Sequence, residues 1–173
     1  MSTRGLWGFK YNNQYKVTYN HNDSYPTCLG YELLEQIKSY SVEHMKKRFD
    51  KIIMVNEDDI VPNTIYNNLL LHKYITPSKS KDYYFVLREW QGQLKPYMEY
   101  EYPYMCDSIE LFADKRNIII EYSYIIDLDD EVFISYKSIR NKPVGISLDA
   151  IKLVSFDDYI DILKGCWGAG EVD

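Results

Sequence analysis

The pattern that most constrains the fold is a hairpin signal near the N-terminus. Within 14–20, tyrosine or valine occupies every second position, as in a strand with one buried face. The segment Leu6–Tyr11 before it is also strand-like, and Asn12-Asn13 between the two tolerates the positive φ angles of a two-residue turn. We therefore expect two antiparallel strands at the start of the chain.

A second hairpin signal lies in the last third of the chain. The apolar segments Ile118–Ile126 and Val132–Tyr136 flank the acidic run Asp127–Glu131, which has the composition of a turn. A further short strand is expected at Ile151–Val154.

Helical patterns fill the region between the hairpins and follow the second one. We expect helices over Cys28–Tyr40, from a Ser41 cap to Phe49, over Pro62–Tyr74, from an Asp82 cap to Trp90, and from a Ser155 cap to Leu163. This order predicts an α+β fold: a single domain over 1–173, with an antiparallel sheet built from the N-terminal and C-terminal hairpins and helices packed against it. Residues 164–173 are expected to form a loose tail.

Composition narrows the class of protein. Of the 173 residues, 46% are hydrophobic and 27% are charged, which suits one folded domain. No apolar run approaches the roughly 18 residues of a membrane span, and the start of the chain lacks the features of a signal peptide. The three cysteines are widely spaced, which argues against disulfides and structural zinc. We expect a cytoplasmic protein with no membrane partner.

The net charge of −6 limits the partners further. Lys and Arg are scattered apart from Lys46-Lys47-Arg48, so no direct sequence-specific binding of nucleic acid is expected. An acidic surface favours basic partners, such as the positively charged channel of a nucleic-acid enzyme.

Polar side chains gather in Thr18–Pro26, where the second strand ends and the first helix begins. His21 beside Asp23 can serve as a general base or as a metal ligand, and functional sites often lie at such strand ends. The alternative interpretation is a structural corner, with side chains bonded to local backbone and Pro26 starting the helix. On the functional interpretation, the binding residues are Arg4, Asn20, His21, Asp23, Ser24 and Tyr25.

A second candidate surface is the stretch 97–105, which interleaves tyrosine with methionine and glutamate. Tyrosine and methionine are favoured at protein interfaces, but the same pattern suits a core strand with the acids outward. On the interface interpretation, the binding residues are Tyr97, Tyr100, Tyr102 and Tyr104.

Signals for catalysis and metal binding are sparse. The acidic run Asp127–Glu131 lacks the spacing and the glycine of a calcium loop, so a solvated turn is favoured and neither a metal nor a cofactor is predicted. One enzyme hypothesis exists: after removal of Met1, Ser2 or Thr3 acts as an N-terminal nucleophile with Arg4 nearby. Otherwise we expect no catalytic residues.

Three stretches resemble a widespread group of short bacterial, prophage and phage proteins. They are Ser2–Phe9 with Thr18–Pro26 and Leu29-Gly30, then Leu87–Gly92, and finally Glu121–Asp129. Small phage-borne proteins of this sort include inhibitors of CRISPR nucleases. The resemblance therefore implies a defence inhibitor, and it carries over no catalytic residues.

Three hypotheses of function follow. The leading one is a non-enzymatic phage or mobile-element protein that acts in the host bacterial cell and inhibits a defence nuclease, with the type II RNA-guided nuclease or its ribonucleoprotein complex as the partner. The second is an N-terminal-nucleophile amide hydrolase. The third is a protein that sequesters a signalling nucleotide, with Arg4, His21 and tyrosines around it.

Overall fold

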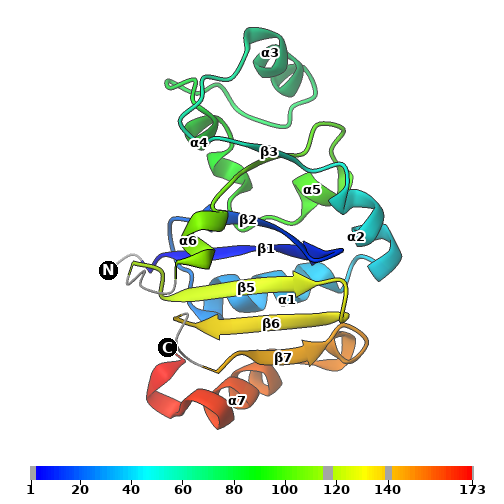
Figure 1. Ribbon diagram of the computed structural model, residues 1–173, viewed down its shortest axis with the longest axis vertical. Coiled ribbons are helices and arrows are strands. Elements are labelled where there is room, and N and C mark those ends of the chain that lie inside the picture. The colour runs from blue at the N-terminus through cyan, green and yellow to red at the C-terminus, as the bar shows by residue number, and fades with distance from the viewer. Residues whose placement is uncertain (1–2, 115–118, 139–141, 173) are drawn as a thin grey trace.

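Two hairpins lie side by side in the computed structural model, which describes residues 3–114, 119–138 and 142–172 (Figure 1). Within these residues the main sheet has five strands in the order β2-β1-β5-β6-β7. They are β1 (Gly5–Tyr11), β2 (Gln14–Asn20), β5 (Tyr122–Asp127), β6 (Val132–Lys137) and β7 (Val144–Ser147). A smaller parallel sheet pairs β3 (Ile53–Val55) with β4 (Tyr104–Cys106).

The N-terminal hairpin confirms the predicted turn. Tyr11 pairs with Gln14, so Asn12 and Asn13 form a two-residue connection with φ angles of 50° and 58°. Positive φ at both central residues gives the turn that matches the twist of the flanking strands, and asparagine tolerates that conformation.

The C-terminal hairpin is also confirmed where it is described. Strands β5 and β6 are antiparallel, with Asp127 opposite Val132 at the acidic turn. The start of the predicted strand at Ile118 lies outside the described residues, and the described strand begins at Tyr122.

The two hairpins meet through a parallel pair of strands, β1 and β5. Gly5 is in register with Tyr122, and Lys10 with Asp127. The expected antiparallel pairing therefore holds within each hairpin, whereas the strands that join the two hairpins, β1 and β5, pair in parallel. A parallel pair requires a long crossover connection, which the whole segment between β2 and β5 supplies.

Three of the helices begin where their cap residues predicted. Ser41, Asp82 and Ser155 each accept a hydrogen bond from the backbone three residues further on. The helical elements are η1 (Pro26–Gly30, a π-helical turn), α1 (Tyr31–Ile37), α2 (Val42–Phe49), α3 (Asn63–Leu71), α4 (Tyr83–Val86), η2 (Arg88–Trp90), α5 (Lys95–Glu99), α6 (Ile109–Ala113), η3 (Ala150–Leu153), α7 (Phe156–Trp167) and η4 (Ala169–Glu171).

The last strand lies earlier in the chain than predicted. Residues 151–154 were expected as a strand, but 150–153 form the 3₁₀ helix η3, in which Ile151 is buried and Leu153 is 89% exposed. The strand is β7, whose Val144 and Ile146 alternate inward. Periodicity alone cannot distinguish a short apolar run in a strand from one in a helix, which is why the prediction was wrong.

The C-terminal residues pack on the fold, which corrects the prediction of a loose tail. Helix α7 continues to Trp167, four residues past the predicted end at Leu163. Val172 is 1% exposed, and the Tyr122 hydroxyl donates to the Glu171 carbonyl at 3.3 Å. Apolar burial of this kind holds the segment through residue 172.

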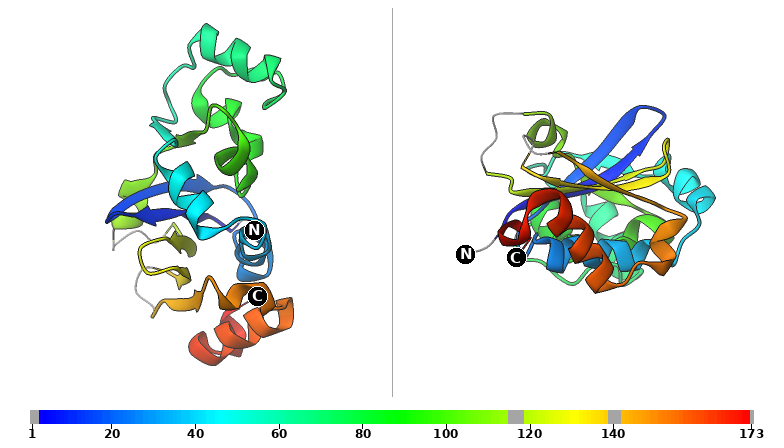
Figure 2. Two further views of the ribbon diagram at one scale, coloured as in Figure 1. Left: turned by 90° about the vertical axis from the view of Figure 1, so that its right-hand side faces the viewer. Right: turned by 90° about the horizontal axis from the view of Figure 1, so that it is seen from below.

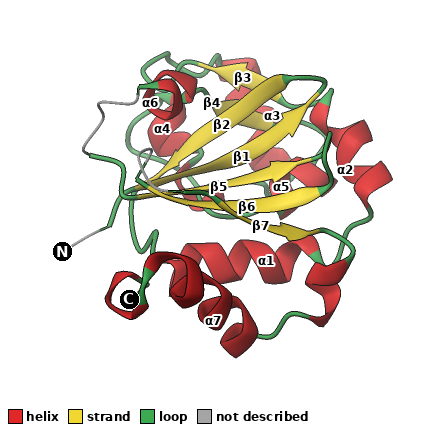
Figure 3. Ribbon diagram, turned by 60° about the horizontal axis from the view of Figure 1, so that its bottom comes forward, coloured by secondary structure: helices red, strands yellow, loops and turns green. Residues whose placement is uncertain are grey.

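The helices cover the two faces of the main sheet unequally. Helices α1 and α7 pack on one face (Figures 2 and 3), where Tyr124 and Phe133 of the sheet meet Tyr159 of α7. The other face carries a smaller cluster around Leu6 and Ile125, partly covered by α6. The rest of the crossover segment, with β3, β4 and α3–α5, lies beyond the β2 edge (Figure 1). No helix in the described ranges is long and apolar enough to span a bilayer.

Candidate functional site

The corner after β2 is built on a hydrogen-bonded pair, Asn20 and Ser24. Asn20 Nδ2 donates to Ser24 Oγ at 2.9 Å, and Ser24 Oγ donates to the Asn20 carbonyl at 3.4 Å. Asn20 is 6% exposed and Ser24 is fully buried. Asp23 has a φ of 50°, a left-handed conformation in which aspartate is enriched. Asn20 and Ser24 therefore hold the shape of the corner.

Two distant segments hold the corner in place. The Tyr124 hydroxyl of β5 donates to the Ser24 carbonyl at 2.9 Å, and the Ser24 N–H donates to the Thr3 carbonyl at 3.3 Å. Tyr25 is half-buried and packs its ring 6.1 Å from that of Tyr122. The corner is thus attached to the central strand β5 and to the segment just before β1.

The corner does not cap the following helix with a side chain. Helix η1 begins at Pro26, and Tyr25 at its N-cap makes no side-chain cap hydrogen bond. The carbonyl of Asp23 accepts from the Leu29 N–H at 3.2 Å instead. The structural interpretation therefore holds for Asn20 and Ser24, and the side chain of Asp23 is available for another role.

A pocket of about 280 Å³ opens beside the corner, and we call it the corner pocket. One wall is the corner with the start of the helical segment after it, and the opposite wall is η2 with the residues that follow. The lining residues are Asn20, His21, Asn22, Asp23, Cys28, Leu29, Glu32, Arg88, Gln91 and Gly92.

The opposite wall is held to the corner through Gln91 and to helix α1 through Gly92. The His21 N–H donates to Gln91 Oε1 at 2.9 Å. Gln36 of α1 donates from Nε2 to the Gly92 carbonyl at 3.0 Å. Gly92 has a φ of 71°, and a Cβ there would lie 3.1 Å from Leu29 Cδ1. The position thus requires glycine both for its conformation and for close approach.

Three charged side chains line the corner pocket and form no ion pairs with one another. Asp23, Glu32 and Arg88 are exposed, and their side chains make no ion pair or hydrogen bond to another described residue. Arg88 lies over the Phe85 ring at 6.0 Å. Carboxylates accept from ammonium and amide groups, and a guanidinium donates to carboxylates and phosphates. The pocket therefore offers both signs of charge to one ligand.

Two further groups line the pocket, His21 and Cys28. His21 Nδ1 lies 3.3 Å from the Tyr19 hydroxyl. Burial raises the pKa of Tyr19, so this hydroxyl stays protonated near neutral pH. Cys28 is half-buried and also lines the pocket. The lining therefore includes a histidine and a cysteine.

Comparison with protein-family models, curated protein sequences and solved structures finds no match to this chain.

Two of the three stretches singled out in the sequence, Thr18–Pro26 and Leu87–Gly92, line this pocket, and the third supports its wall from behind. The first contains Asn20–Asp23, the second contains Arg88, Gln91 and Gly92, and the third contains Tyr124, which holds Ser24. The first two are far apart in the chain, and the fold brings them together around one opening.

The N-terminal candidates occupy different places. Arg4 is exposed and does not line the corner pocket, and its carbonyl accepts from the Glu121 N–H at 3.1 Å. Thr3 is 1% exposed. Ser2 lies outside the described residues. The N-terminal-nucleophile hypothesis stays a prediction, and an intact mass that retains Met1 in active protein would rule it out.

The four tyrosines of the 97–105 stretch lie away from the corner pocket, and two belong to the core. Tyr97 is 3% exposed between Trp7 and Trp90, with ring centroids at 5.6 and 6.1 Å. Burial raises the pKa of its hydroxyl. Tyr104 of β4 is 9% exposed.

The other two tyrosines are only half-buried. Tyr100 stacks on Tyr74 with centroids 3.9 Å apart, and Tyr102 packs its edge against His72. The stretch forms α5 and β4 with a connection between them, so it is neither one strand nor one continuous surface.

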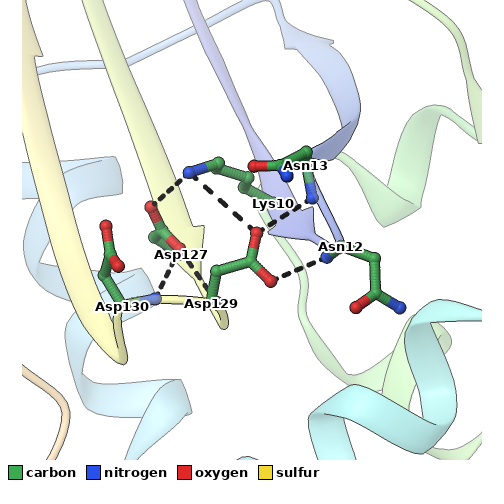
Figure 4. Close-up of polar contacts among 6 residues, drawn as sticks. All are labelled: Lys10, Asn12, Asn13, Asp127, Asp129 and Asp130. Atoms are coloured by element: carbon green, nitrogen blue, oxygen red, sulfur yellow. Dashed lines mark hydrogen bonds and ion pairs between the residues drawn. The ribbon is translucent and has the colours of Figure 1, made fainter.

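Hydrogen bonds and an ion pair from the acidic turn join the two hairpins (Figure 4). Asp129 accepts from the backbone N–H groups of Asn12 and Asn13 at 2.7 and 3.0 Å. Asp127 accepts from the N–H groups of its own turn and pairs with Lys10 at 3.3 Å. Within residues 3–114, 119–138 and 142–172, no group of three or more His, Cys, Asp or Glu side chains is placed to hold a metal ion.

Sequence reasoning missed several groups of the pocket, notably Cys28, Glu32 and Arg88. Cys28 and Glu32 are four residues apart in a helical segment, a spacing that places side chains on one face and was available in the sequence. The approach of Arg88 depends on the path of the crossover segment, for which the sequence carries no local signal.

Proposed function

We propose that the protein binds a small charged ligand in the corner pocket. The observation that carries the proposal is the presence of uncommitted charges of both signs, Asp23 and Glu32 against Arg88, around one opening of about 280 Å³. Binding sites usually combine a preformed cavity with a few convergent polar groups. The hydrogen bonds through Gln91, Gln36 and Ser24 keep this cavity preformed.

The lining indicates the chemistry of the ligand. A volume near the lower end of small-molecule sites favours a metabolite or a part of one. Arg88 suits a phosphate or carboxylate, and the two carboxylates suit an amine or an amide. His21 and Gln91 add groups that can orient the ligand. Since no tyrosine lines this pocket, a nucleotide here would be recognised by its polar edges and its phosphate.

This proposal fits the defence-inhibitor role that the resemblance implies. A phage-borne protein that sequesters a charged signalling molecule would silence a defence system without touching its nuclease. The corner pocket supports that mode because it needs binding alone, and binding requires no catalytic residue.

Titration calorimetry tests the proposal with AMP, ADP-ribose and glycylglycine as probes. Arg88→Gln should weaken probes with an anionic group about tenfold, and Asp23→Asn should do the same for probes with an amine. Lys152→Gln is the matched control, because Lys152 is exposed on η3 beside the opposite edge strand. No heat of binding with any probe, in protein shown to be folded, would remove the proposal.

A second candidate function is inhibition of a defence nuclease, and a different surface supports it. A groove of about 540 Å³ between β3 and α6 carries four carboxylates, those of Glu57, Asp58, Asp107 and Glu110. Burial and the neighbouring carboxylates raise the pKa of Glu57, so a cation placed there would relieve the crowding of like charges. A lysine or arginine from the nucleic-acid channel of a nuclease has the complementary charge.

Co-purification with the type II nuclease–guide complex, followed by a DNA cleavage assay, tests the second candidate. The double variant Glu57→Gln with Glu110→Gln should reduce binding and release cleavage, while Asp161→Asn on the distant helix α7 should not. Failure to bind, with unimpaired cleavage across several nuclease orthologues, would eliminate this function.

A further inference from the structure

A second cavity adjoins the corner pocket and shares one residue with it, Arg88. It has a volume of about 640 Å³, and we call it the loop groove. Its lining residues are Thr76, Pro77, Ser78, Lys79, Ser80, Phe85, Val86, Arg88 and Glu89. Arg88 therefore lies between the two cavities.

The loop groove is held in shape by contacts along its wall. Thr76 Oγ1 donates to Glu89 Oε1 at 2.7 Å, which fixes the loop to η2. The Ser78 N–H donates to the Tyr66 hydroxyl at 3.0 Å, and the Ser80 hydroxyl donates to the Asp82 carboxylate. A ligand would therefore meet a preorganised loop, which lowers the entropic cost of binding.

Two cations line the groove, Lys79 and Arg88, and no anionic partner for either lies among the described residues. Lys79 is exposed and, like Arg88, makes no ion pair or hydrogen bond with its side chain to the part of the chain that the structure describes. The one carboxylate that lines the groove, Glu89, is engaged by Thr76. Although the net charge of the protein is −6, the two unpaired cations make the loop groove locally suited to an anion.

We propose that the ligand of the corner pocket extends past Arg88 into the loop groove and ends there in an anionic group, a phosphate or a carboxylate. The inference rests on the proposed ligand-binding function and makes it more specific. The guanidinium of Arg88 contacts the middle of the ligand, and Lys79 with the hydroxyl of Ser78 contacts its end. Extended phosphate esters and anionic peptides share this chemistry.

Calorimetry with a graded series of probes tests the inference: adenosine, AMP, ATP, inorganic tripolyphosphate and tri-aspartate. ATP should bind more tightly than AMP, and adenosine should bind most weakly. Lys79→Gln should weaken ATP about tenfold while leaving AMP unchanged, and Arg88→Gln should weaken both. Higher salt should reduce the difference between ATP and AMP, because exposed charges are screened.

The remaining probes separate the two sources of the anionic end. Tripolyphosphate that competes with ATP identifies the phosphate chain as the recognised part, and tri-aspartate that competes identifies a peptide carboxylate. Lys152→Gln serves as the control for a general loss of positive charge.

The inference fails if AMP and ATP bind equally and Lys79→Gln changes neither, while Arg88→Gln still weakens both. That result would leave the corner pocket as the whole site. If none of these probes binds folded protein, the proposed function itself fails, so the two failures are distinguishable.

Discussion

The hydroxyl of Tyr124 donates to the carbonyl oxygen of Ser24 at 2.9 Å across a sequence separation of 100 residues. This bond joins the central strand β5 to the corner that forms one wall of the corner pocket. Both residues are fully buried, so water cannot replace either partner. The position of the pocket therefore depends on a contact between the two hairpins.

Removing that hydroxyl should loosen the corner. We expect Tyr124→Phe to lower the free energy of unfolding by about 1–2 kcal/mol, because the Ser24 carbonyl is left buried without its donor. Urea denaturation measures the change. Tyr136→Phe, in which a half-buried ring on the other face loses a hydroxyl, is the control and should change stability by less than about 0.5 kcal/mol. Equal effects of the two variants would show that the bond contributes nothing specific.

Gly92 should not tolerate a side chain. Gly92→Ala forces a left-handed conformation on alanine and brings its Cβ within 3.1 Å of Leu29 Cδ1, so we expect a loss of about 1–2 kcal/mol and weaker binding in the corner pocket. Gly165→Ala is the matched control, because Gly165 lies within α7 and a Cβ added there would meet open space. There the same change should stabilise the helix by up to about 1 kcal/mol. Thermal or urea unfolding compares them.

The hydrogen bonds between Asp129 and the Asn12-Asn13 turn should make the stability of the protein depend on pH. Hydrogen bonds from the N–H groups of Asn13 and Asn12 lower the pKa of Asp129 below its ordinary value of 3.8. Since the folded-state pKa is the lower one, the contribution is fully present above the ordinary pKa and is lost as pH falls through the folded-state value. Urea midpoints at pH 7 and pH 3 should therefore differ less in Asp129→Asn than in the parent protein. The same change at Asp161, an exposed residue of α7, should leave the difference intact.

The three cysteines should react at different rates with a thiol reagent. Burial raises the pKa of the Cys106 thiol to about 12, so Cys106 should stay unmodified until the protein unfolds. Cys166 is exposed and Cys28 is half-exposed, so both should be labelled in the folded protein. A ligand in the corner pocket should protect Cys28 and leave Cys166 reactive. Peptide mass mapping reads the sites, and labelling of Cys28 that no bound probe slows would contradict its place in the pocket wall.

Local signals in the sequence predicted the elements that depend on neighbouring residues. The positive φ angles of Asn12 and Asn13 were expected from residue type and spacing, and Ser41 and Ser155 cap helices where their sequences indicated. Such features rest on hydrogen bonds and backbone preferences within a few residues. For that reason they can be predicted without knowledge of the fold.

Features that depend on burial and long-range contacts were not predicted correctly from the sequence. The short apolar run at 151–154 is compatible with either a strand or a helical turn. The strand lies instead at 144–147, where Val144 and Ile146 pack inward. The glycine-rich end suggested a loose tail, but Val172 finds an apolar site that only the folded core provides. Tyrosine is a residue type favoured at interfaces, but Tyr97 packs between two tryptophans and belongs to the core.

By itself the sequence determined the two hairpins, the starts of the helices capped by Ser41, Asp82 and Ser155, and the α+β class, because each follows from residue type and short spacing. It also marked the polar corner after Asn20. Only the tertiary structure decided that β1 and β5 pair in parallel, and that the crossover segment returns Arg88 and Gln91 to face that corner. These relationships connect residues from 65 to 117 positions apart, and nothing short of the complete packing of the sheet and its helices specifies them.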